Sequence, residues 1–390
     1  MGKYVDLKGY PTPYYIVYEE RLRRNLDLIT QVARDAGVKI IMAFKANALW
    51  RTFGVMREYG IESTASSLNE MRLANDELGT LAHTYCPAYT AITIGQYLAG
   101  SSHITFNSIS QYLRFKGDVE MFNSLDGGHR VSCGLRVNPM CSVIATDIYN
   151  PCCPGSRFGV TADEIDELPD GIEGFHFHAL CESSSYDLQH VLEAFESQFG
   201  KFLPRLKWVN MGGGHLMTRA GYDTAHLVQL LRGFKERYPG IEVILEPGSA
   251  FTWRTGDLMA SVVDVVENSG IKTAIIDVSF ACHMPDCLEM PYKPAITEAL
   301  DDEGVQDNGV YTYRMGGNSC LSGDFVGDWS FAAPLKEGDR LTFEDMNHYT
   351  TVKTNMFNGI QHPSILYVHC DGRVEVLREF TYADYKSRMS

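Results

Sequence analysis

Short apolar runs recur along the first two thirds of the chain, and amphipathic segments separate them. Each run has the length of a buried strand, and several of the intervening segments carry helix boundary signals. Ser67 with Glu70, and Thr161 with Glu164, have the spacing of a capping box, and Gly79 is placed to end a helix. The runs are Lys39–Lys45, Ile61–Ala65, Ala82–Cys86, Ile104–Asn107, Ser132–Val137, Ile172–His178, Lys207–Met211 and Glu242–Glu246.

The alternation of these eight candidate strands with helices predicts a parallel sheet. Eight strand–helix units over about 230 residues fit a closed (β/α)8 barrel. A doubly wound open sheet is the alternative that the pattern alone leaves open. We therefore predict an α/β fold with a TIM-type barrel over residues 26–254.

After Trp253 the pattern changes to runs in which apolar and polar residues alternate, as in half-buried strands. The runs are Asp257–Glu267, Ala274–Val278, Val310–Met315, Arg340–Glu344 and Ile365–Glu379. Within the last run, Asp371 and Gly372 form a strong hairpin signal. We predict a second, mostly antiparallel domain over 255–390, a β-barrel or sandwich, which the N-terminal strand segment 1–25 joins.

Composition and charge narrow the function classes. The 390 residues include 34 basic and 49 acidic side chains, a net charge of −15. This balance disfavours a nucleic-acid partner and suits a cationic ligand, although an acidic surface also simply favours solubility. Ten cysteines form no CxxC pair, and neither an N-terminal apolar segment nor a membrane-spanning run is present. We expect a cytoplasmic protein with no membrane partner.

Candidate chemistry lies where the predicted barrel strands end, because active sites of such barrels form there. The first strand ends at Lys45 within AFKANA, after an apolar run. A lysine beside a desolvated site has a lowered pKa, which provides a neutral amine that can form an imine. The alternative is a lysine that extends from a strand end into solvent.

Three further strand ends carry functional residue types. The sixth strand ends in HFHAL, where His176 and His178 share a face and can stack on a planar cofactor or move a proton. The alternative is that both are packed in the core. The two histidines could also bind a metal ion, but the sequence offers no third ligand at a suitable spacing. Gly212, Gly213 and Gly214 follow the seventh strand, where backbone N–H groups can approach a phosphate.

The eighth strand ends in Glu246-Pro247-Gly248. A buried carboxylate needs a cationic or hydrogen-bonding partner, and either a protonated pyridine nitrogen or Arg136 would serve. An amine, a stacking group, a phosphate loop and a carboxylate together match the needs of pyridoxal 5'-phosphate. We therefore expect that cofactor and no metal.

With these residues assembled, the chain resembles the pyridoxal-phosphate-dependent decarboxylases of the alanine racemase fold, nearly from end to end. The resemblance implies that Lys45 bonds the cofactor, His178 stacks on its ring and the Gly212–Gly214 loop holds its phosphate. It implies that Glu246 of the EPG motif binds the ring nitrogen and that Gly248 of the same motif is a further cofactor-binding residue. It also implies that Tyr349 reaches the phosphate and that SRFGV, with Arg157, lies on the substrate side.

Within that family, the run Ala274–Pro294 is similar to carboxynorspermidine and carboxyspermidine decarboxylases. The resemblance implies decarboxylation in polyamine biosynthesis by a homodimer with shared sites, in which Cys320 of GGNSCLSGD enters the partner's site and protonates the substrate. Asp277, Asp286 and Asp324 are candidates for binding the amines of a polyamine-like substrate.

Two departures from better-known relatives bear on the substrate. Ser249 follows EPG where an arginine is usual, so part of the phosphate contact stays unassigned, and Leu321 follows Cys320 where diaminopimelate enzymes place glutamate. The alternatives are a decarboxylase of ornithine, lysine, arginine or diaminopimelate with the same fold, and a non-catalytic homologue that binds the cofactor.

Overall fold

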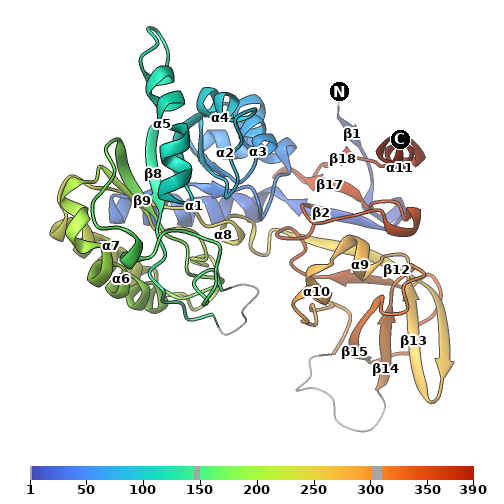
Figure 1. Ribbon diagram of the computed structural model, residues 1–390. Helices are drawn as coiled ribbons and strands as arrows, with labels where there is room; N and C mark the ends of the chain where they lie inside the picture. Colours follow the sequence, from blue (N-terminus) through green and yellow to red (C-terminus); the bar gives the residue numbers. More distant parts are fainter. Residues whose placement is uncertain (1, 145–149, 301–309) are drawn as a thin grey trace. The chain divides into compact units, whose positions relative to one another are not determined.

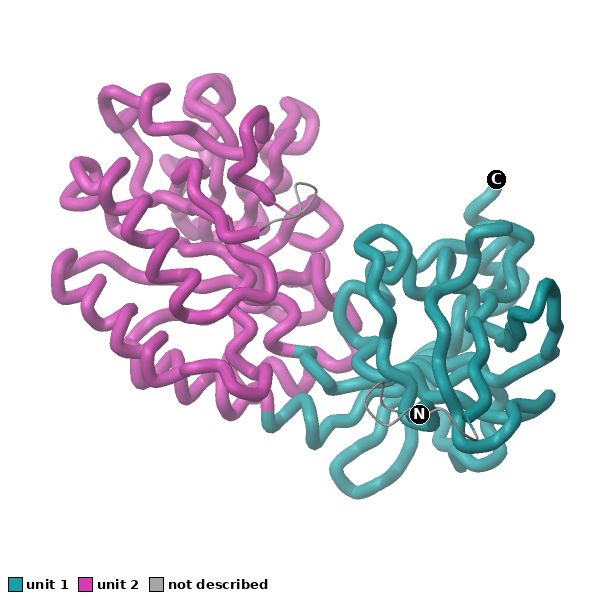
Figure 2. Tube along the Cα trace, turned by 90° about the horizontal axis from the view of Figure 1, so that it is seen from below, with its two compact units in different colours: residues 1–24, 252–390 teal, residues 25–251 magenta. Residues whose placement is uncertain are grey.

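The computed structural model describes residues 2–144, 150–300 and 310–390 (Figure 1). The chain divides into two compact units (Figure 2). Residues 25–251 form one unit, and residues 1–24 with 252–390 form the other. The N-terminal segment thus belongs to the same unit as the C-terminal third of the chain.

The unit of residues 25–251 is built on a parallel sheet. Its strands are β3 (Lys39–Ile40), β4 (Met42–Ala43), β5 (Ser63–Ala65), β6 (Ala82–Tyr85), β7 (Ser101–Phe106), β8 (Ser132–Arg136), β9 (Ile172–His176), β10 (Trp208–Asn210) and β11 (Glu242–Leu245). The hydrogen-bonded order runs β3-β11-β10-β9-β8-β7-β6-β5-β4. Because only Ile41 separates β3 from β4, the two ends of this order are halves of one strand and the sheet closes on itself. The predicted eight-stranded barrel is confirmed, and the open sheet is wrong.

One helix precedes the barrel strands, and further helices follow most of them. They are α1 (Glu19–Ala36), α2 (Phe53–Glu58), α3 (Leu68–Leu73), α4 (Ile94–Gly100), α5 (Ile109–Asn123), α6 (Ser185–Phe199), α7 (Thr224–Arg237) and α8 (Ser249–Thr252). The Ser67 hydroxyl caps α3 by accepting a hydrogen bond from the Glu70 N–H, and Gly79 adopts a left-handed φ of 78°. The capping box of Thr161 and Glu164 begins only a single 3-10 turn, Ala162–Glu164.

One end of the barrel interior is filled by Trp208, which is 3% exposed and lies at the start of β10. Its indole N–H donates a hydrogen bond of 2.8 Å to the Ser132 hydroxyl. Gly134 and Gly174, on β8 and β9, leave the room for the indole, since a Cβ at either position would overlap the Trp208 ring atoms. Glycine is thus needed here for packing rather than for an unusual backbone conformation.

We expect Gly174→Ala to destabilise the protein by about 1–3 kcal/mol or more, because the new methyl group cannot fit beside Trp208 without moving it. Chemical denaturation measures the change. Gly117→Ala is the matched control: Gly117 lies inside α5 with open space at its Cβ position, so its replacement should stabilise the helix by up to about 1 kcal/mol. Equal effects of the two substitutions would contradict this description of the barrel core.

The second unit is built on a mixed sheet. Its strands are β1 (Lys3–Tyr4), β2 (Tyr14–Tyr18), β12 (Gly256–Asn268), β13 (Ile271–Ile276), β14 (Tyr311–Gly316), β15 (Phe325–Phe331), β16 (Arg340–Phe343), β17 (Ser364–Val368) and β18 (Val374–Arg378). The order is β1-β18-β17-β2-β12-β13-β14-β15, with β16 beside β12. Its helices are α9 (Phe280–His283), α10 (Asp286–Glu289) and α11 (Tyr382–Met389).

Most neighbours in this sheet are antiparallel, as predicted, and β17 and β18 form the expected hairpin around Asp371 and Gly372. Two pairs are parallel, β2 with β17 and β13 with β14. Strand β15 was not predicted, because Gly327 and Asp328 interrupt its apolar alternation.

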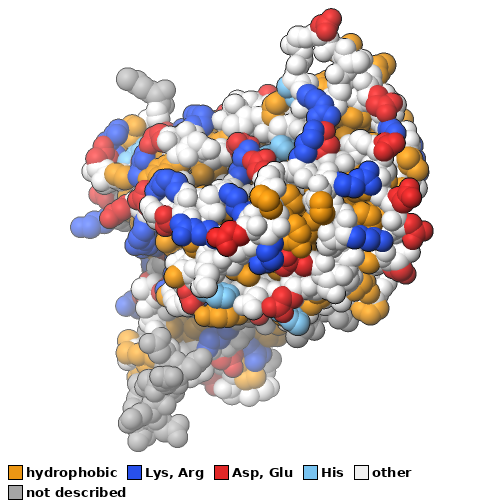
Figure 3. Space-filling view, turned by 90° about the vertical axis from the view of Figure 1, so that its left-hand side faces the viewer, with side chains coloured by type: hydrophobic (Ala, Val, Ile, Leu, Met, Phe, Trp, Pro, Cys, Tyr) orange, Lys and Arg blue, Asp and Glu red, His pale blue; other side chains and the backbone are white. Residues whose placement is uncertain are grey.

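The surface shows how the excess negative charge is distributed. On the face drawn in Figure 3, acidic and basic side chains are interspersed rather than gathered into a field of one sign. None of the described helices is both long enough and apolar enough to cross a membrane. All ten cysteines are free thiols, so no disulfide contributes to either unit.

Candidate active site

Lys45 and His178 meet where two barrel strands end. Lys45 follows β4, His178 follows β9, and 3.5 Å separates the Lys45 Nζ atom from the His178 Nε2 atom. The Lys45 side chain is accessible to solvent and therefore open to a ligand. Desolvation by the surrounding protein and the charge of Arg136 nevertheless lower its pKa, against an opposing effect of Glu246. This direction favours the neutral amine that bond formation with a carbonyl requires.

The glycine loop fixes the orientation of the His178 ring. The Gly213 N–H donates a hydrogen bond of 3.1 Å to the His178 Nδ1 atom, so the proton of the neutral ring lies on Nε2, toward Lys45. Desolvation, together with the charge of Arg136, holds the pKa of His178 well below its usual range. His178 is therefore a neutral ring at physiological pH.

Close packing explains why the loop after β10 consists of glycines. A Cβ on Gly213 would lie 2.7 Å from the Glu246 carbonyl oxygen, and a Cβ on Gly212 or Gly214 would overlap the backbone of residues 177–180. Gly212 and Gly214 also have φ values of 73° and 91°. The loop can therefore bring backbone N–H groups beside the strand that carries His178.

Glu246 lies between two side chains that donate hydrogen bonds to it. His176 Nε2 lies 3.0 Å from Glu246 Oε1, and Asn210 Nδ2 donates a hydrogen bond of 2.9 Å to Glu246 Oε2. Burial alone would raise the pKa of Glu246, but the interactions with His176 and Asn210 lower it below its usual range. The carboxylate is therefore ionised.

Arg136, the alternative partner for Glu246, lies elsewhere. Its guanidinium group lies 4.6 Å from the ring centroid of Tyr85 and 4.4 Å from that of Phe158. Arg136 is only 5% exposed. Among the described residues, no lysine or arginine lies within ion-pair distance of Glu246, and its nearest basic side chain is the His176 ring.

Gly248 and Arg157 occupy different environments. A Cβ on Gly248 would lie 2.5 Å from the Ala46 Cβ atom, so this glycine lets the EPG segment pack against the residues that flank Lys45. Arg157 is exposed, and its guanidinium lies 4.2 Å from the Phe158 ring centroid. It stays free to meet a ligand from solvent.

In the other unit, Cys320 lies in a tightly held loop. Its backbone N–H donates a hydrogen bond of 2.9 Å to the Asn358 Oδ1 atom, and its thiol side is exposed. Asp324, only 4% exposed, accepts hydrogen bonds from the N–H groups of Ala281 (3.0 Å) and Ser319 (3.1 Å). The loop therefore presents a thiol from a backbone that is anchored on both sides.

The acidic candidates for amine binding already have protein partners. Asp324 holds the cysteine loop, as above. Asp277 accepts a hydrogen bond of 2.6 Å from the Thr12 hydroxyl and one of 2.8 Å from the Ser261 N–H. Asp286 pairs at 2.6 Å with Lys353, which also bonds Glu289. These contacts favour structural roles for Asp277 and Asp324, because their oxygens are directed into the fold.

Tyr349 is partly buried in the segment after β16, and its φ of 52° is unusual for a residue with a side chain. Asn210 and Asn358 were not predicted as site residues. The signal for Asn210 was its place in the NMGGG motif, since the parallel register sets it opposite His176. Asn358 had a weaker signal in the NG pair of residues 358 and 359, typical of a turn with positive φ.

The residues fit pyridoxal phosphate by their chemistry. A neutral amine on an accessible lysine, a neutral flat ring, an ionised carboxylate and a glycine loop free of Cβ atoms lie at neighbouring strand ends of one barrel. Within the described residues, no cluster of His, Cys, Asp and Glu has the composition to bind a metal ion.

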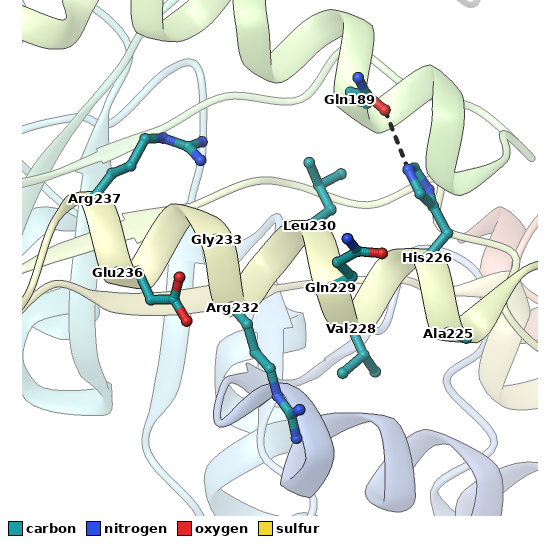
Figure 4. Close-up of a pocket in the computed structure, with 10 residues that line it drawn as sticks. All are labelled: Gln189, Ala225, His226, Val228, Gln229, Leu230, Arg232, Gly233, Glu236 and Arg237. Atoms are coloured by element: carbon teal, nitrogen blue, oxygen red, sulfur yellow. Dashed lines mark hydrogen bonds between the residues drawn. The ribbon is translucent and has the colours of Figure 1, made fainter.

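An outer pocket lies away from these strand ends, along α7 and against α6 (Figure 4). Several of its polar side chains have protein partners: His226 contacts Gln189 at 3.1 Å, Arg232 donates to the Asp35 carbonyl, and Arg237 pairs with Glu196. None of the predicted site residues lines it.

Comparisons with known proteins place the chain in a family. A family model described as the C-terminal sheet domain of pyridoxal-dependent decarboxylases matches residues 142–347. The chain is 43% identical to a carboxyaminopropylagmatine decarboxylase of Synechocystis sp., over 98% of this chain and 96% of that protein. It is 39% identical to a carboxynorspermidine/carboxyspermidine decarboxylase of Campylobacter jejuni, over 97% of this chain and 98% of that protein.

Structural comparison agrees. The crystal structure of the Campylobacter jejuni carboxynorspermidine decarboxylase complexed with norspermidine matches with a TM-score of 0.88 and 37% identity, over 97% of this chain and 100% of that chain. The chain therefore belongs to the pyridoxal-phosphate-dependent decarboxylases, and within them to the carboxynorspermidine/carboxyspermidine decarboxylase family.

Proposed function

We propose that this enzyme removes CO2 from carboxyspermidine and carboxynorspermidine and forms spermidine and norspermidine. The observation that carries the proposal is the full-length identity of 39% with a relative named for these two substrates. The matching crystal structure, which contains norspermidine, supports the same class of substrate. The reaction would take place in the cytoplasm as a step of polyamine biosynthesis.

Pyridoxal phosphate, when bound, accepts the electron pair that the departing CO2 leaves on the substrate's α-carbon. Lys45 would hold the cofactor covalently and release it to the substrate amine, which requires the neutral amine that its lowered pKa favours. Glu246 would pair with the protonated ring nitrogen, and the ring of His178 would lie against the cofactor face.

Other residues would hold the cofactor phosphate, meet the substrate and supply the final proton. The backbone of Gly212–Gly214 would hold the phosphate, with Gly248 keeping the EPG segment close to Lys45 and Tyr349 adding a hydroxyl. Arg157, exposed beside Phe158, would meet the substrate. The exposed thiol of Cys320 would return a proton to the α-carbon.

We place Cys320 in the site of a partner subunit and so propose a homodimer with shared active sites. The hydrogen bonds of its loop to Asn358 and Asp324 hold the backbone of Cys320 in place, which supports a role as a positioned proton donor rather than as a surface thiol without a function. Of the three acidic candidates for the distal amines, Asp286 is the one paired with an ammonium group, that of Lys353, which a substrate ammonium can replace.

The carboxyaminopropylagmatine decarboxylase of Synechocystis sp. favours a second candidate substrate. At 43% identity over nearly the whole chain, it is named for carboxyaminopropylagmatine, which ends in a guanidinium group instead of an amine. The decarboxylation chemistry would be the same, and only the recognition of the distal cation would differ.

A substrate comparison tests the proposal. We expect kcat/KM for carboxyspermidine and carboxynorspermidine to exceed that for ornithine, lysine, arginine and diaminopimelate by at least about 100-fold, since a site built for several amines discriminates against chains that lack them. Carboxyaminopropylagmatine is assayed in parallel. A preference for carboxyaminopropylagmatine would transfer the assignment to that substrate, and a preference for one of the four amino acids would contradict both.

A further inference from the structure

The parallel register of three barrel strands brings one buried histidine onto Glu246. Asn210 on β10 lies opposite His176 on β9 and opposite Ile244 on β11, two residues before Glu246. Side chains of alternate residues share a face of a strand, so His176, Asn210 and Glu246 point to the same side of the barrel wall. The backbone thus fixes the position of this trio.

Each carboxylate oxygen of Glu246 accepts one hydrogen bond from another member of this trio. His176 contacts Oε1 at 3.0 Å, and Asn210 donates to Oε2 at 2.9 Å. The Asn210 amide cannot be reversed without loss, because its Oδ1 atom accepts a hydrogen bond of 2.9 Å from the Gly212 N–H. Asn210 therefore links the carboxylate to the glycine loop and contributes no charge.

The surroundings of His176 determine where its proton lies. His176 is 2% exposed, and its Nδ1 atom has no hydrogen-bond partner among the described residues. A proton on Nδ1 would be buried and unpaired, whereas a proton on Nε2 is donated to Glu246. Burial of the ring and the charge of Arg136 also lower the pKa of His176, against the opposing effect of Glu246, and so oppose a second proton on the ring.

The carboxylate is consequently held by two neutral donors and carries its full negative charge. It is only 12% exposed, and a buried charge without a counterion is costly. A histidinium ion at position 176 would satisfy that charge from within the protein. A neutral ring leaves it to be satisfied by a cation that arrives with the ligand.

We propose that His176 is a positioning residue which, as a neutral Nε2–H donor, keeps Glu246 ionised and unpaired so that the carboxylate holds a proton on the cofactor's ring nitrogen. This inference rests on the proposed function of Glu246 and extends it to a residue that does not itself touch the cofactor. A merely structural histidine would affect folding and cofactor content but not the protonation of that nitrogen.

Two substitutions with the same functional group separate these roles. The amide nitrogen of glutamine can reach the place of the histidine Nε2 atom, whereas that of asparagine lies near Nδ1 and falls short of Glu246. In His176→Gln the donor is retained, and in His176→Asn it is lost. The direct measurement is the 15N chemical shift of the ring nitrogen in enzyme loaded with 15N-labelled pyridoxal phosphate.

We expect the wild type and His176→Gln to show a protonated ring nitrogen and His176→Asn to shift toward the unprotonated pyridine value. With the natural cofactor, kcat of His176→Asn should fall by roughly 10–100-fold, as is usual when the support of a site group is removed, while His176→Gln should stay within about threefold of wild type. An unshifted nitrogen in His176→Asn would overturn the inference.

A cofactor analogue with a C–H group in place of the ring nitrogen separates the role of His176 from the role of Glu246. We expect the analogue to lower kcat of the wild type and to abolish the difference between wild type and His176→Asn. If the difference persists with the analogue, only the role of His176 is overturned. If the analogue costs the wild type nothing, the role of Glu246 in the proposed function fails, and that of His176 fails with it.

Discussion

Lys45→Ala should abolish decarboxylation and remove the long-wavelength absorbance that pyridoxal phosphate acquires when it is bonded to a lysine. The loss in kcat should be roughly 10³-fold or more, because the variant lacks the group that bonds the cofactor and exchanges it for the substrate amine. The position of Lys45 supports this expectation, because its accessible Nζ atom lies 3.5 Å from His178 Nε2. Desolvation is the main cause of the lowered pKa of the Lys45 amine.

A surface lysine supplies the control for that experiment. Lys116 lies on α5, where it forms an ion pair of 3.8 Å with Glu120, and Lys116→Ala should leave both the absorbance and kcat unchanged. The spectrum and the turnover rate are measured on cofactor-loaded protein in each case. Retention of the absorbance and the activity by Lys45→Ala would remove this residue from the mechanism.

Cys320→Ala should lower kcat by roughly 10²–10⁴-fold, the usual contribution of a positioned acid. The thiol is exposed in a loop whose backbone is bound by Asn358 and Asp324, so its removal should not disturb the fold. Cys320→Ser is the conservative comparison and should remain strongly impaired, because a serine hydroxyl is a much weaker acid. Single-turnover kinetics show whether CO2 release or the later proton transfer has slowed. Unchanged turnover and product would contradict the assignment.

Mixing two inactive variants tests whether Cys320 serves the partner's site. Subunits with Lys45→Ala lack the cofactor bond and subunits with Cys320→Ala lack the proton donor, so a mixed dimer with shared sites contains one site with both residues intact. We expect partial recovery of activity on mixing and exchange of subunits. Confirmed mixed dimers without any recovery would exclude a shared site.

The barrel was predictable because its strands are short apolar runs separated by helices with visible caps. The elements that the sequence did not predict correctly each have a local cause. Gly327 and Asp328 hide β15 from the apolar alternation, and the capping box of Thr161 and Glu164 precedes only one turn, because a cap satisfies N–H groups without supplying a packed helix face.

Some residues of the candidate site were likewise predictable from the sequence, and others were not. Lys45, His178 and Glu246 were found because strand ends of a barrel converge, a rule that needs only strand boundaries. The sequence did not show that His176 and Asn210, rather than Arg136, surround Glu246, because that depends on register and side-chain direction. For the same reason Asp277 and Asp324 looked available to a substrate, although the fold turns them toward backbone amides.

The most direct test is a measurement of CO2 release from carboxyspermidine by the purified protein, before removal of pyridoxal phosphate, after removal, and after its return. The predicted result is one CO2 for each spermidine formed, loss of activity with the cofactor and recovery when it is restored. No CO2 release from carboxyspermidine, carboxynorspermidine or carboxyaminopropylagmatine, in protein whose Lys45 is shown to bond the cofactor, would contradict it and indicate a binding protein without catalysis.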